Sequence, residues 1–176
     1  MAKHATKFLD IVNAAKANVR QVTIHDIKPR LDRGEMLCFG YSPLPPFLRY
    51  HVISKEGRLV RTEEIEVPVP TMMHDFAITE RHALFMDLPV VFDIEQALSG
   101  AGGMPYHWSD DHGARIGVLP RNGSAADLRW FEIEPCYVFH PFNAYDDGRR
   151  IVCDMAQYPR LPLALPGETG TVVASS

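Results

Sequence analysis

Histidine side chains are the groups of this sequence best suited to chemistry, because neutral imidazole commonly binds zinc, copper, iron and nickel. The chain has eight. Two of them, His74 and His140, begin similar stretches: HDF at 74–76 and HPF at 140–142 are each followed by a polar turn and by an apolar segment ten to eleven residues after the histidine. Because repeated hairpins place equivalent residues in equivalent positions, we expect these imidazoles to converge and to bind a metal.

A weaker copy of the same unit contains His25, which precedes a turn at 32–34 and a segment that opens at Met36, again eleven residues on. His25 is therefore the third candidate metal ligand. Imidazole does not select one metal by itself, and these ligands are too far apart in sequence for a helical motif of the HExxH kind. We expect structural or surface roles for the other histidines, which are His4, His51, His82, His107 and His112.

The elements that would position these histidines are short strands. From residue 35 onward, apolar segments rich in β-branched and aromatic residues alternate with turns that contain Gly, Pro or Asp. This pattern predicts an all-β fold built as an antiparallel meander, and the repeated hairpins indicate blades of a β-propeller. The predicted strands are 35–41, 47–54, 58–67, 72–78, 82–88, 114–120, 128–134, 136–140 and 149–155.

The two ends of the chain differ from its centre. Apolar residues at helical spacing within 1–22 predict a short amphipathic helix, and the Pro-, Gly- and Ser-containing segment 163–176 predicts a flexible tail. The region between them, 23–162, is the expected partial propeller domain. Its one long connection, 93–112, predicts a short helix followed by a glycine-rich loop.

Composition argues against several classes of function. The net charge of -4 and the scattered Lys and Arg residues make nucleic acid an unexpected partner. No apolar run approaches the roughly 20 residues of a transmembrane helix, and no signal-peptide pattern is present. Cys38, Cys136 and Cys153 are far apart and form no CxxC motif, which is typical of reduced thiols. We therefore expect a cytoplasmic protein without a transmembrane segment.

Five blocks of sequence resemble a known family. GEMLCFGY, MMHDFAITERHALFMDLPVVFD, GARIGVLPR, RWFEIEPCYVFHPFNAYDDG and RRIVCDM are similar, in this order and almost continuously, to the central region of carotenoid cleavage oxygenases. The resemblance extends over about 34–162. That family includes carotenoid, apocarotenoid and lignostilbene dioxygenases and the retinal pigment epithelial membrane protein group.

The resemblance implies a seven-bladed β-propeller with Fe(II) on its axis, held by four histidines from different blades. Motif by motif, His74 matches the second ligand and His140 the third. His25 stands near the place of the first, but one extra residue separates it from the next block and no His-Pro-Lys follows. The family's fourth histidine and outer-shell glutamates have no counterpart in this sequence. At roughly 40 to 45 residues per blade, the chain supplies about three to four blades.

The function implied by this resemblance is an Fe(II)-dependent dioxygenase that cleaves a C=C double bond of a carotenoid, apocarotenoid or stilbene-type substrate to two carbonyl products. Its partners would be dioxygen and an apolar, conjugated small molecule in a tunnel with aromatic walls. Candidate wall residues are Phe76, Trp108, Phe142 and Tyr145.

Two other interpretations stand beside this one. The first is an inactive, truncated remnant of such an enzyme with weak metal binding, which the extra residue near His25 and the predicted tail favour. The second is a zinc-dependent hydrolase. That activity requires a Glu or Asp base beside an open metal position, and no motif in the sequence supplies one.

Overall fold

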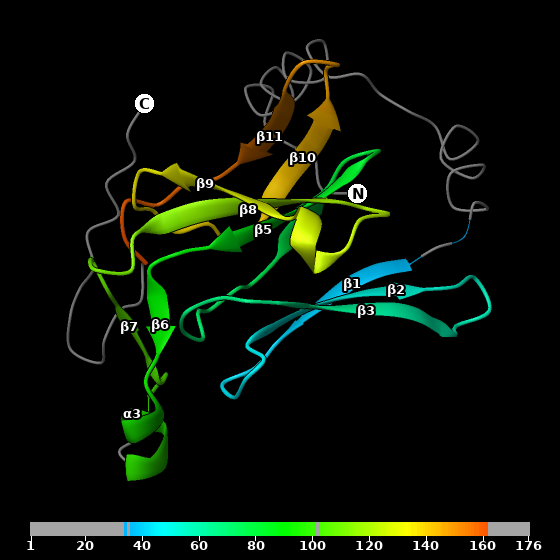
Figure 1. Cartoon of the computed structure of the whole chain (residues 1–176). Helices are drawn as coiled ribbons and strands as arrows, with labels where there is room; N and C mark the ends of the chain where they lie inside the picture. Colours follow the sequence, from blue (N-terminus) through cyan, green and yellow to red (C-terminus); the bar gives the residue numbers. More distant parts are fainter. Residues whose placement is uncertain (1–33, 35, 101–102, 162–176) are drawn as a thin grey trace, which may run out of the picture.

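The computed structural model describes residues 34, 36–100 and 103–161 (Figure 1). The helix predicted for 1–22, the tail predicted for 163–176 and the candidate ligand His25 lie outside the described residues. Within them, antiparallel strands provide most of the regular structure. The all-β prediction is therefore confirmed.

The first sheet contains β1 (Met36–Tyr41), β2 (Leu48–Ile53) and β3 (Leu59–Ile65), in that spatial order. Buried and half-buried residues alternate strictly along the central strand β2. Successive side chains of a strand point to opposite faces, so one face of β2 packs into the core. The sequence places its bulkiest apolar groups, including Tyr50, on that face.

The second sheet has the order β4-β5-β8-β9, formed by β4 (Phe76–Ile78), β5 (His82–Asp87), β8 (Ala114–Pro120) and β9 (Arg129–Ile133). A single turn of 3-10 helix, η1 (Ala125–Asp127), connects the last two strands. Every residue of β5 after the first is buried. Continuous burial shows that both faces of this central strand are covered by other elements.

The long connection between β5 and β8 forms a separate projection. It contains the two-stranded pair β6 (Val90–Phe92) and β7 (Tyr106–Trp108), with α3 (Ile94–Ser99) between them. Asp93 caps this helix by accepting a hydrogen bond from the Gln96 amide at 2.9 Å. The short helix predicted within this connection is thus confirmed.

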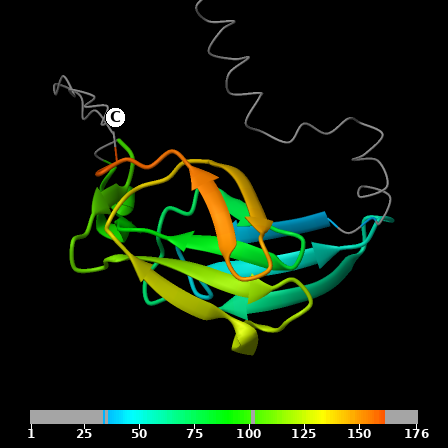
Figure 2. The same cartoon turned by 90° about the horizontal axis from the view of Figure 1, so that it is seen from above.

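The last pair of strands, β10 (Pro141–Asp146) and β11 (Ile151–Met155), forms an antiparallel hairpin. Figures 1 and 2 show the β4-β5-β8-β9 sheet between this hairpin and the β1-β2-β3 sheet. Because the two outer sheets lie on opposite sides of the central one, the chain forms a stack of sheets around its buried strands.

Two predicted strands differ from the structure. In 72–78 only Phe76–Ile78 forms a strand, and 136–140 contributes one isolated bridge, from Tyr137 to Tyr158. Pairing of β4 with β5 starts at Phe76 opposite Phe85, although β5 continues to Asp87. The chain before Phe76 bonds elsewhere, because the Met72 amide donates to the Val90 carbonyl at 2.7 Å. His74 and His140 therefore stand just before strands β4 and β10, and the prediction that each lies on a strand is wrong.

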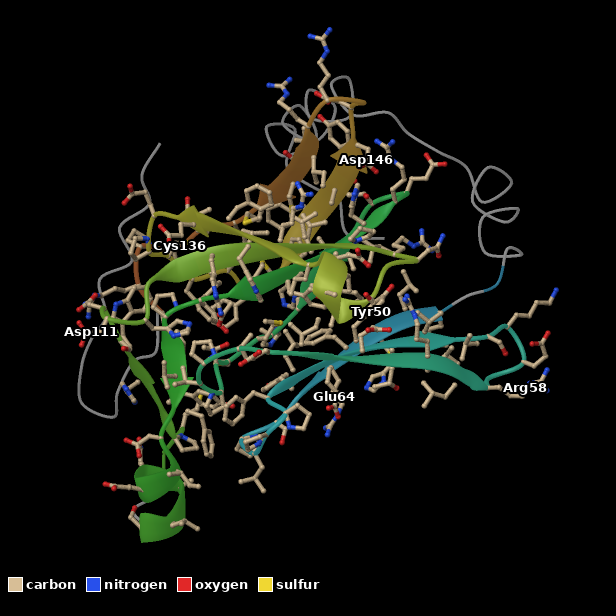
Figure 3. All side chains as sticks on the ribbon, in the orientation of Figure 1. Tyr50, Arg58, Glu64, Asp111, Cys136 and Asp146 are labelled. Atoms are coloured by element: carbon tan, nitrogen blue, oxygen red, sulfur yellow. The ribbon has the colours of Figure 1, made fainter. Side chains whose placement is uncertain are left out.

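Two buried clusters hold the sheets together. The first fills the space between the β1-β2-β3 and β4-β5-β8-β9 sheets and includes Tyr50, which is labelled in Figure 3. The rings of Tyr50 and Phe85 meet edge to face at 5.8 Å. The second includes Leu88, Val90 and Tyr137 and joins the end of β5 to the segment before β10. Aromatic side chains buried in this way each contribute several kcal/mol to packing, about 3–5 for Phe→Ala.

Candidate metal centre

His74 and His140 lie side by side although they are 66 positions apart in sequence. Their ring centroids are 4.8 Å apart, and the ring planes are nearly perpendicular, at 82°. Both side chains are exposed. The converging hairpins thus bring the two imidazoles into direct contact at the surface of the described residues.

Buried neighbours in the sequence fix this position. Met73, directly before His74, is buried in the first cluster, and Met72 is buried in the second. Cys136 to Val138, shortly before His140, are buried in the second cluster. Two exposed histidines that each follow an anchored apolar segment are held at neighbouring points, because packed interiors allow little displacement of such anchors.

Asp75 and Phe139 surround the two imidazoles. Asp75 Oδ2 lies 3.2 Å from Nδ1 of His140, while Asp75 Oδ1 accepts a hydrogen bond from the Phe76 amide at 2.8 Å. An ionised carboxylate is only an acceptor, so this contact favours the His140 tautomer with its proton on Nδ1 and leaves the Nε2 lone pair free. The Phe139 ring meets the His74 ring edge to face at 5.5 Å.

This pair fits part of a metal site. Imidazole nitrogens bind metals at about 2.0–2.1 Å, so two ligands in adjacent coordination positions have nitrogens about 3 Å apart. Edge-to-face rings with centroids 4.8 Å apart are close enough for that arrangement. However, residues 34, 36–100 and 103–161 contain no group of three or more His, Cys, Asp or Glu side chains that could hold a metal ion. The described residues supply two candidate ligands, and His25 lies outside them.

Each of the other described histidines has a hydrogen-bond or ion-pair partner, in agreement with the prediction of structural roles. His51 Nδ1 lies 2.9 Å from the Thr62 hydroxyl, and His107 Nδ1 lies 4.0 Å from a carboxylate oxygen of Asp93. His82 contacts Asp146 at 3.0 Å, which ties the start of β5 to the β10–β11 hairpin near the labelled Asp146 in Figure 3.

His112 belongs to a buried network around Asp87, at the end of β5. Asp87 is fully buried, and its carboxylate receives hydrogen bonds from the Thr71 hydroxyl, the Arg115 guanidinium and the His112 ring at 2.8–3.0 Å. Burial raises the pKa of Asp87, but the bonds from His112 and Arg115 outweigh this effect and hold the pKa below its ordinary value. The partners of Asp87 are 16 to 28 residues away in sequence, so no local pattern predicts this network.

The four predicted tunnel-wall aromatics lie in three different settings. Phe76 packs against the first core cluster, with its ring 5.0 Å from that of Phe39. Phe142 and Tyr145 are 72% and 45% exposed on β10. Trp108 lies on β7, donates a hydrogen bond to Asp110 and is covered by the Arg160 guanidinium. Among the described residues, the ring contacts of the histidine pair are with each other and with Phe139, and none of these four side chains is among them.

An apolar groove of about 590 Å³ lies between the β4-β5-β8-β9 sheet and the β10–β11 hairpin. Leu84, Met86 and Ile116 line it from the sheet, and Ile151 and Cys153 line it from the hairpin. Burial raises the pKa of the Cys153 thiol, which keeps it protonated and unreactive near neutral pH. His74 and His140 do not line this groove, so the groove is separate from the histidine pair.

One residue of the candidate centre escaped sequence reasoning altogether. Asp75 is next to His74 in sequence, but its carboxylate contacts the imidazole of His140. No local sequence pattern predicts a contact between residues 65 positions apart. A carboxylate next to a candidate ligand was the available signal, because metal-bound histidines commonly bond a carboxylate through the second ring nitrogen.

No described helix is long and apolar enough to cross a membrane.

Known proteins resemble this chain in sequence and in structure. The sequence model of the family described as retinal pigment epithelial membrane protein matches residues 20–170. A carotenoid 9,10(9',10')-cleavage dioxygenase of Crocus sativus is 42% identical over 127 residues, which cover 70% of this chain and 23% of that protein. This chain therefore spans about a quarter of the length of that curated relative.

Solved structures give the same result. The lignostilbene dioxygenase of Pseudomonas brassicacearum superposes with a TM-score of 0.62 and 34% identity, over 70% of this chain and 26% of that one. The cobalt-substituted apocarotenoid oxygenase of Synechocystis superposes with a TM-score of 0.59 and 27% identity, over 68% of this chain and 25% of that one. These likenesses confirm that the stacked antiparallel sheets are part of a β-propeller. The chain belongs to the retinal pigment epithelial membrane protein family, the family of the carotenoid cleavage oxygenases.

Proposed function

We propose that this chain is the part of an Fe(II)-dependent dioxygenase that supplies two iron ligands, His74 and His140. The reaction is cleavage of a C=C double bond of a carotenoid, apocarotenoid or stilbene-type substrate. Both atoms of one dioxygen molecule enter the products, one on each former alkene carbon, so that the alkene and dioxygen together give two carbonyl compounds. The names of the similar proteins, carotenoid cleavage dioxygenase and lignostilbene dioxygenase, support this choice of substrates.

The observation that carries the proposal is the contact of the two imidazoles. Two exposed histidines from separate hairpins lie with ring centroids 4.8 Å apart. Like-charged imidazolium rings would repel each other at this distance, whereas neutral imidazoles can both direct a lone pair to one cation. Such a pair is expected of a metal site and has no evident use in packing, since both rings are exposed.

The residues of this chain would bind the metal ion and orient its histidine ligands. His74 and His140 would hold the ion through ring nitrogens, and when bound the ferrous ion supplies the redox chemistry that lets dioxygen react with an alkene. Asp75 accepts the hydrogen bond of His140 and fixes its ring. Met72 and Met73 anchor the His74 segment in the two core clusters. Rigid supports of this kind keep ligands in place before the substrate arrives.

We also propose His25 as a third candidate ligand of the metal. The partial propeller domain is proposed to extend over 23–162. The family match at 20–170 includes both. The partners that follow are dioxygen and an apolar, conjugated small molecule. We also propose a cytoplasmic location, since Cys38, Cys136 and Cys153 are unpaired thiols.

The proposal is tested by metal binding and product analysis on the 176-residue chain. Anaerobic titration with Fe(II) is expected to give one tightly bound ion. His74→Ala or His140→Ala is expected to lower the affinity by more than the roughly 10- to 100-fold that loss of an outer-shell partner costs. His107→Ala is the matched control, because His107 is also exposed and lies near a carboxylate. The same preparations are then incubated with a stilbene and an apocarotenal in air, and aldehyde products are identified by mass spectrometry.

Unchanged Fe(II) affinity in both histidine variants would refute the ligand assignment.

A second candidate function is favoured by one observation: the described residues hold two candidate ligands and no larger cluster. On that reading the chain is an inactive remnant that binds metal weakly. Weak binding that depends on His74 and His140, without aldehyde products, is the result expected from the remnant.

A further inference from the structure

We infer that Asp75 is a positioning residue for His140. Its carboxylate holds the imidazole as the Nδ1–H tautomer, and Nε2 then carries the lone pair that binds the metal. The inference rests on the proposed function, because it assigns a role at the same centre. It also means that one three-residue segment, 74–76, presents one ligand and orients the other.

The carboxylate of Asp75 is itself fixed. Its Oδ1 accepts a hydrogen bond from the Phe76 amide at 2.8 Å, which leaves Oδ2 to contact His140 Nδ1 at 3.2 Å. Phe76 in turn packs in the first core cluster, with its ring 6.0 Å from that of Phe85. A core side chain, its own amide and a carboxylate thus form a continuous support that ends on the imidazole of His140.

The negative charge of Asp75 is available to His140. Within the part of the chain that the structure describes, no Lys or Arg lies within ion-pair distance of this carboxylate, and its ion-pair partner is the His140 ring. By contrast, Asp87 shares its charge with Arg115 at 2.8 Å. A carboxylate without a competing cation makes the bonded imidazole a stronger electron donor to a metal.

The expected effect is moderate, because both side chains are partly open to solvent: 36% of Asp75 and 61% of His140 are exposed. Removing an outer-shell partner of a metal-bound histidine commonly lowers metal affinity by about 10- to 100-fold. Solvent competition places Asp75 at the lower end, about tenfold.

The test uses Co(II), which can be titrated in air and followed by its visible absorption. Asp75→Ala removes the carboxylate, and Asp75→Asn keeps an acceptor oxygen for the Phe76 amide while it removes the charge. Asp93→Ala is a closely matched control: Asp93 also accepts a local backbone bond, is 35% exposed, and lies 4.0 Å from the His107 ring. Circular dichroism checks that each variant retains the fold.

We expect Co(II) affinity about tenfold lower in Asp75→Ala and no change in Asp93→Ala. In Asp75→Asn the loss is expected to be at least as large, because an amide whose oxygen stays on the Phe76 N–H turns its NH2 group to His140 Nδ1 and favours the opposite tautomer. A second readout isolates the hydrogen bond. In the proton NMR spectrum of the chain saturated with Co(II), the paramagnetically shifted Nδ1–H signal that persists in His74→Ala and disappears in His140→Ala is expected to exchange slowly with water. In Asp75→Ala the same signal is expected to exchange faster or to be lost.

The outcomes separate the two claims. If His140→Ala abolishes binding but Asp75→Ala keeps both the wild-type affinity and the slowly exchanging signal, the positioning role is overturned and the proposed function stands. If His74→Ala and His140→Ala bind Co(II) as tightly as the wild-type chain, the proposed function fails and the role of Asp75 fails with it. Should Asp75→Ala lose its fold, Asp75→Asn decides between these results.

Discussion

Two histidine–aspartate contacts in this protein have similar geometry and opposite settings. His112 meets Asp87 at 3.0 Å in the interior, where Arg115 and Thr71 complete the network. His140 meets an aspartate at 3.2 Å at the surface, beside a second exposed imidazole.

The difference lies in which ring nitrogen remains free and accessible. His112 uses Nε2 for its aspartate, and its side chain is 7% exposed, so it has no accessible lone pair for a metal. His140 uses Nδ1 and keeps Nε2 accessible. The comparison shows that an Asp–His pair by itself does not indicate whether its role is structural or functional. The burial of the pair and the ring nitrogen that bonds the aspartate distinguish the two roles.

The largest expected effect concerns the buried member of the comparison. Asp87→Ala leaves the Arg115 guanidinium and the His112 ring without their acceptor, and breaking such a buried pair costs about 3–5 kcal/mol. Urea unfolding is expected to show this loss. Asp154→Ala, which removes an exposed carboxylate on β11, is the control and is expected to change stability by less than about 0.5 kcal/mol. Equal stability of both variants would contradict the assigned structural role.

A smaller effect is expected at Gly117, on β8 next to the same network. A Cβ atom at this position would lie 2.7 Å from the Trp130 ring, on which the Arg115 guanidinium stacks at 4.2 Å. Gly117→Ala is therefore expected to displace Trp130, to shift its fluorescence and to cost about 1–3 kcal/mol. At Gly40 the nearest atom to an added Cβ is 3.8 Å away, so Gly40→Ala is the control. A Gly117→Ala variant with wild-type fluorescence and stability would contradict the expected displacement of Trp130.

The smallest expected effect is a pH dependence at Asp146, which joins the β10–β11 hairpin to the start of β5. Burial raises the pKa of Asp146, but hydrogen bonds from Thr79, His82 and the Arg81 amide outweigh it and lower the pKa. A carboxyl whose pKa is lower in the folded chain stabilises the fold above its unfolded pKa of about 3.9. That contribution is lost as pH falls through the folded pKa.

Urea unfolding at several pH values between 6 and 3 checks this effect. The wild-type chain is expected to be more stable than Asp146→Asn at pH 6, and the difference is expected to shrink as the pH falls below about 4. A difference that stays constant over this range would show that the Asp146 contacts do not depend on its charge.

Much of the architecture followed from the sequence. The alternation of apolar and polar residues in β2 and the short helix after Asp93 were predictable, because side-chain period and helix capping are local properties. The repeated stretches at 74–76 and 140–142 indicated matching hairpins. By contrast, the extents of the strands near both histidines were mispredicted, because strand pairing depends on partners that are remote in sequence. Before Phe76, for example, the Met72 amide bonds to the Val90 carbonyl and not to β5.

The sequence by itself determined that this protein is an all-β member of its family, and it singled out His74 and His140 as candidates. Only the tertiary structure decided that their rings touch, that Asp75 serves one of them, and that His112 is occupied in the interior. The physical reason is that residue type and spacing report what a side chain can do. Which groups meet across many residues, and how much water reaches them, depends on how the sheets pack.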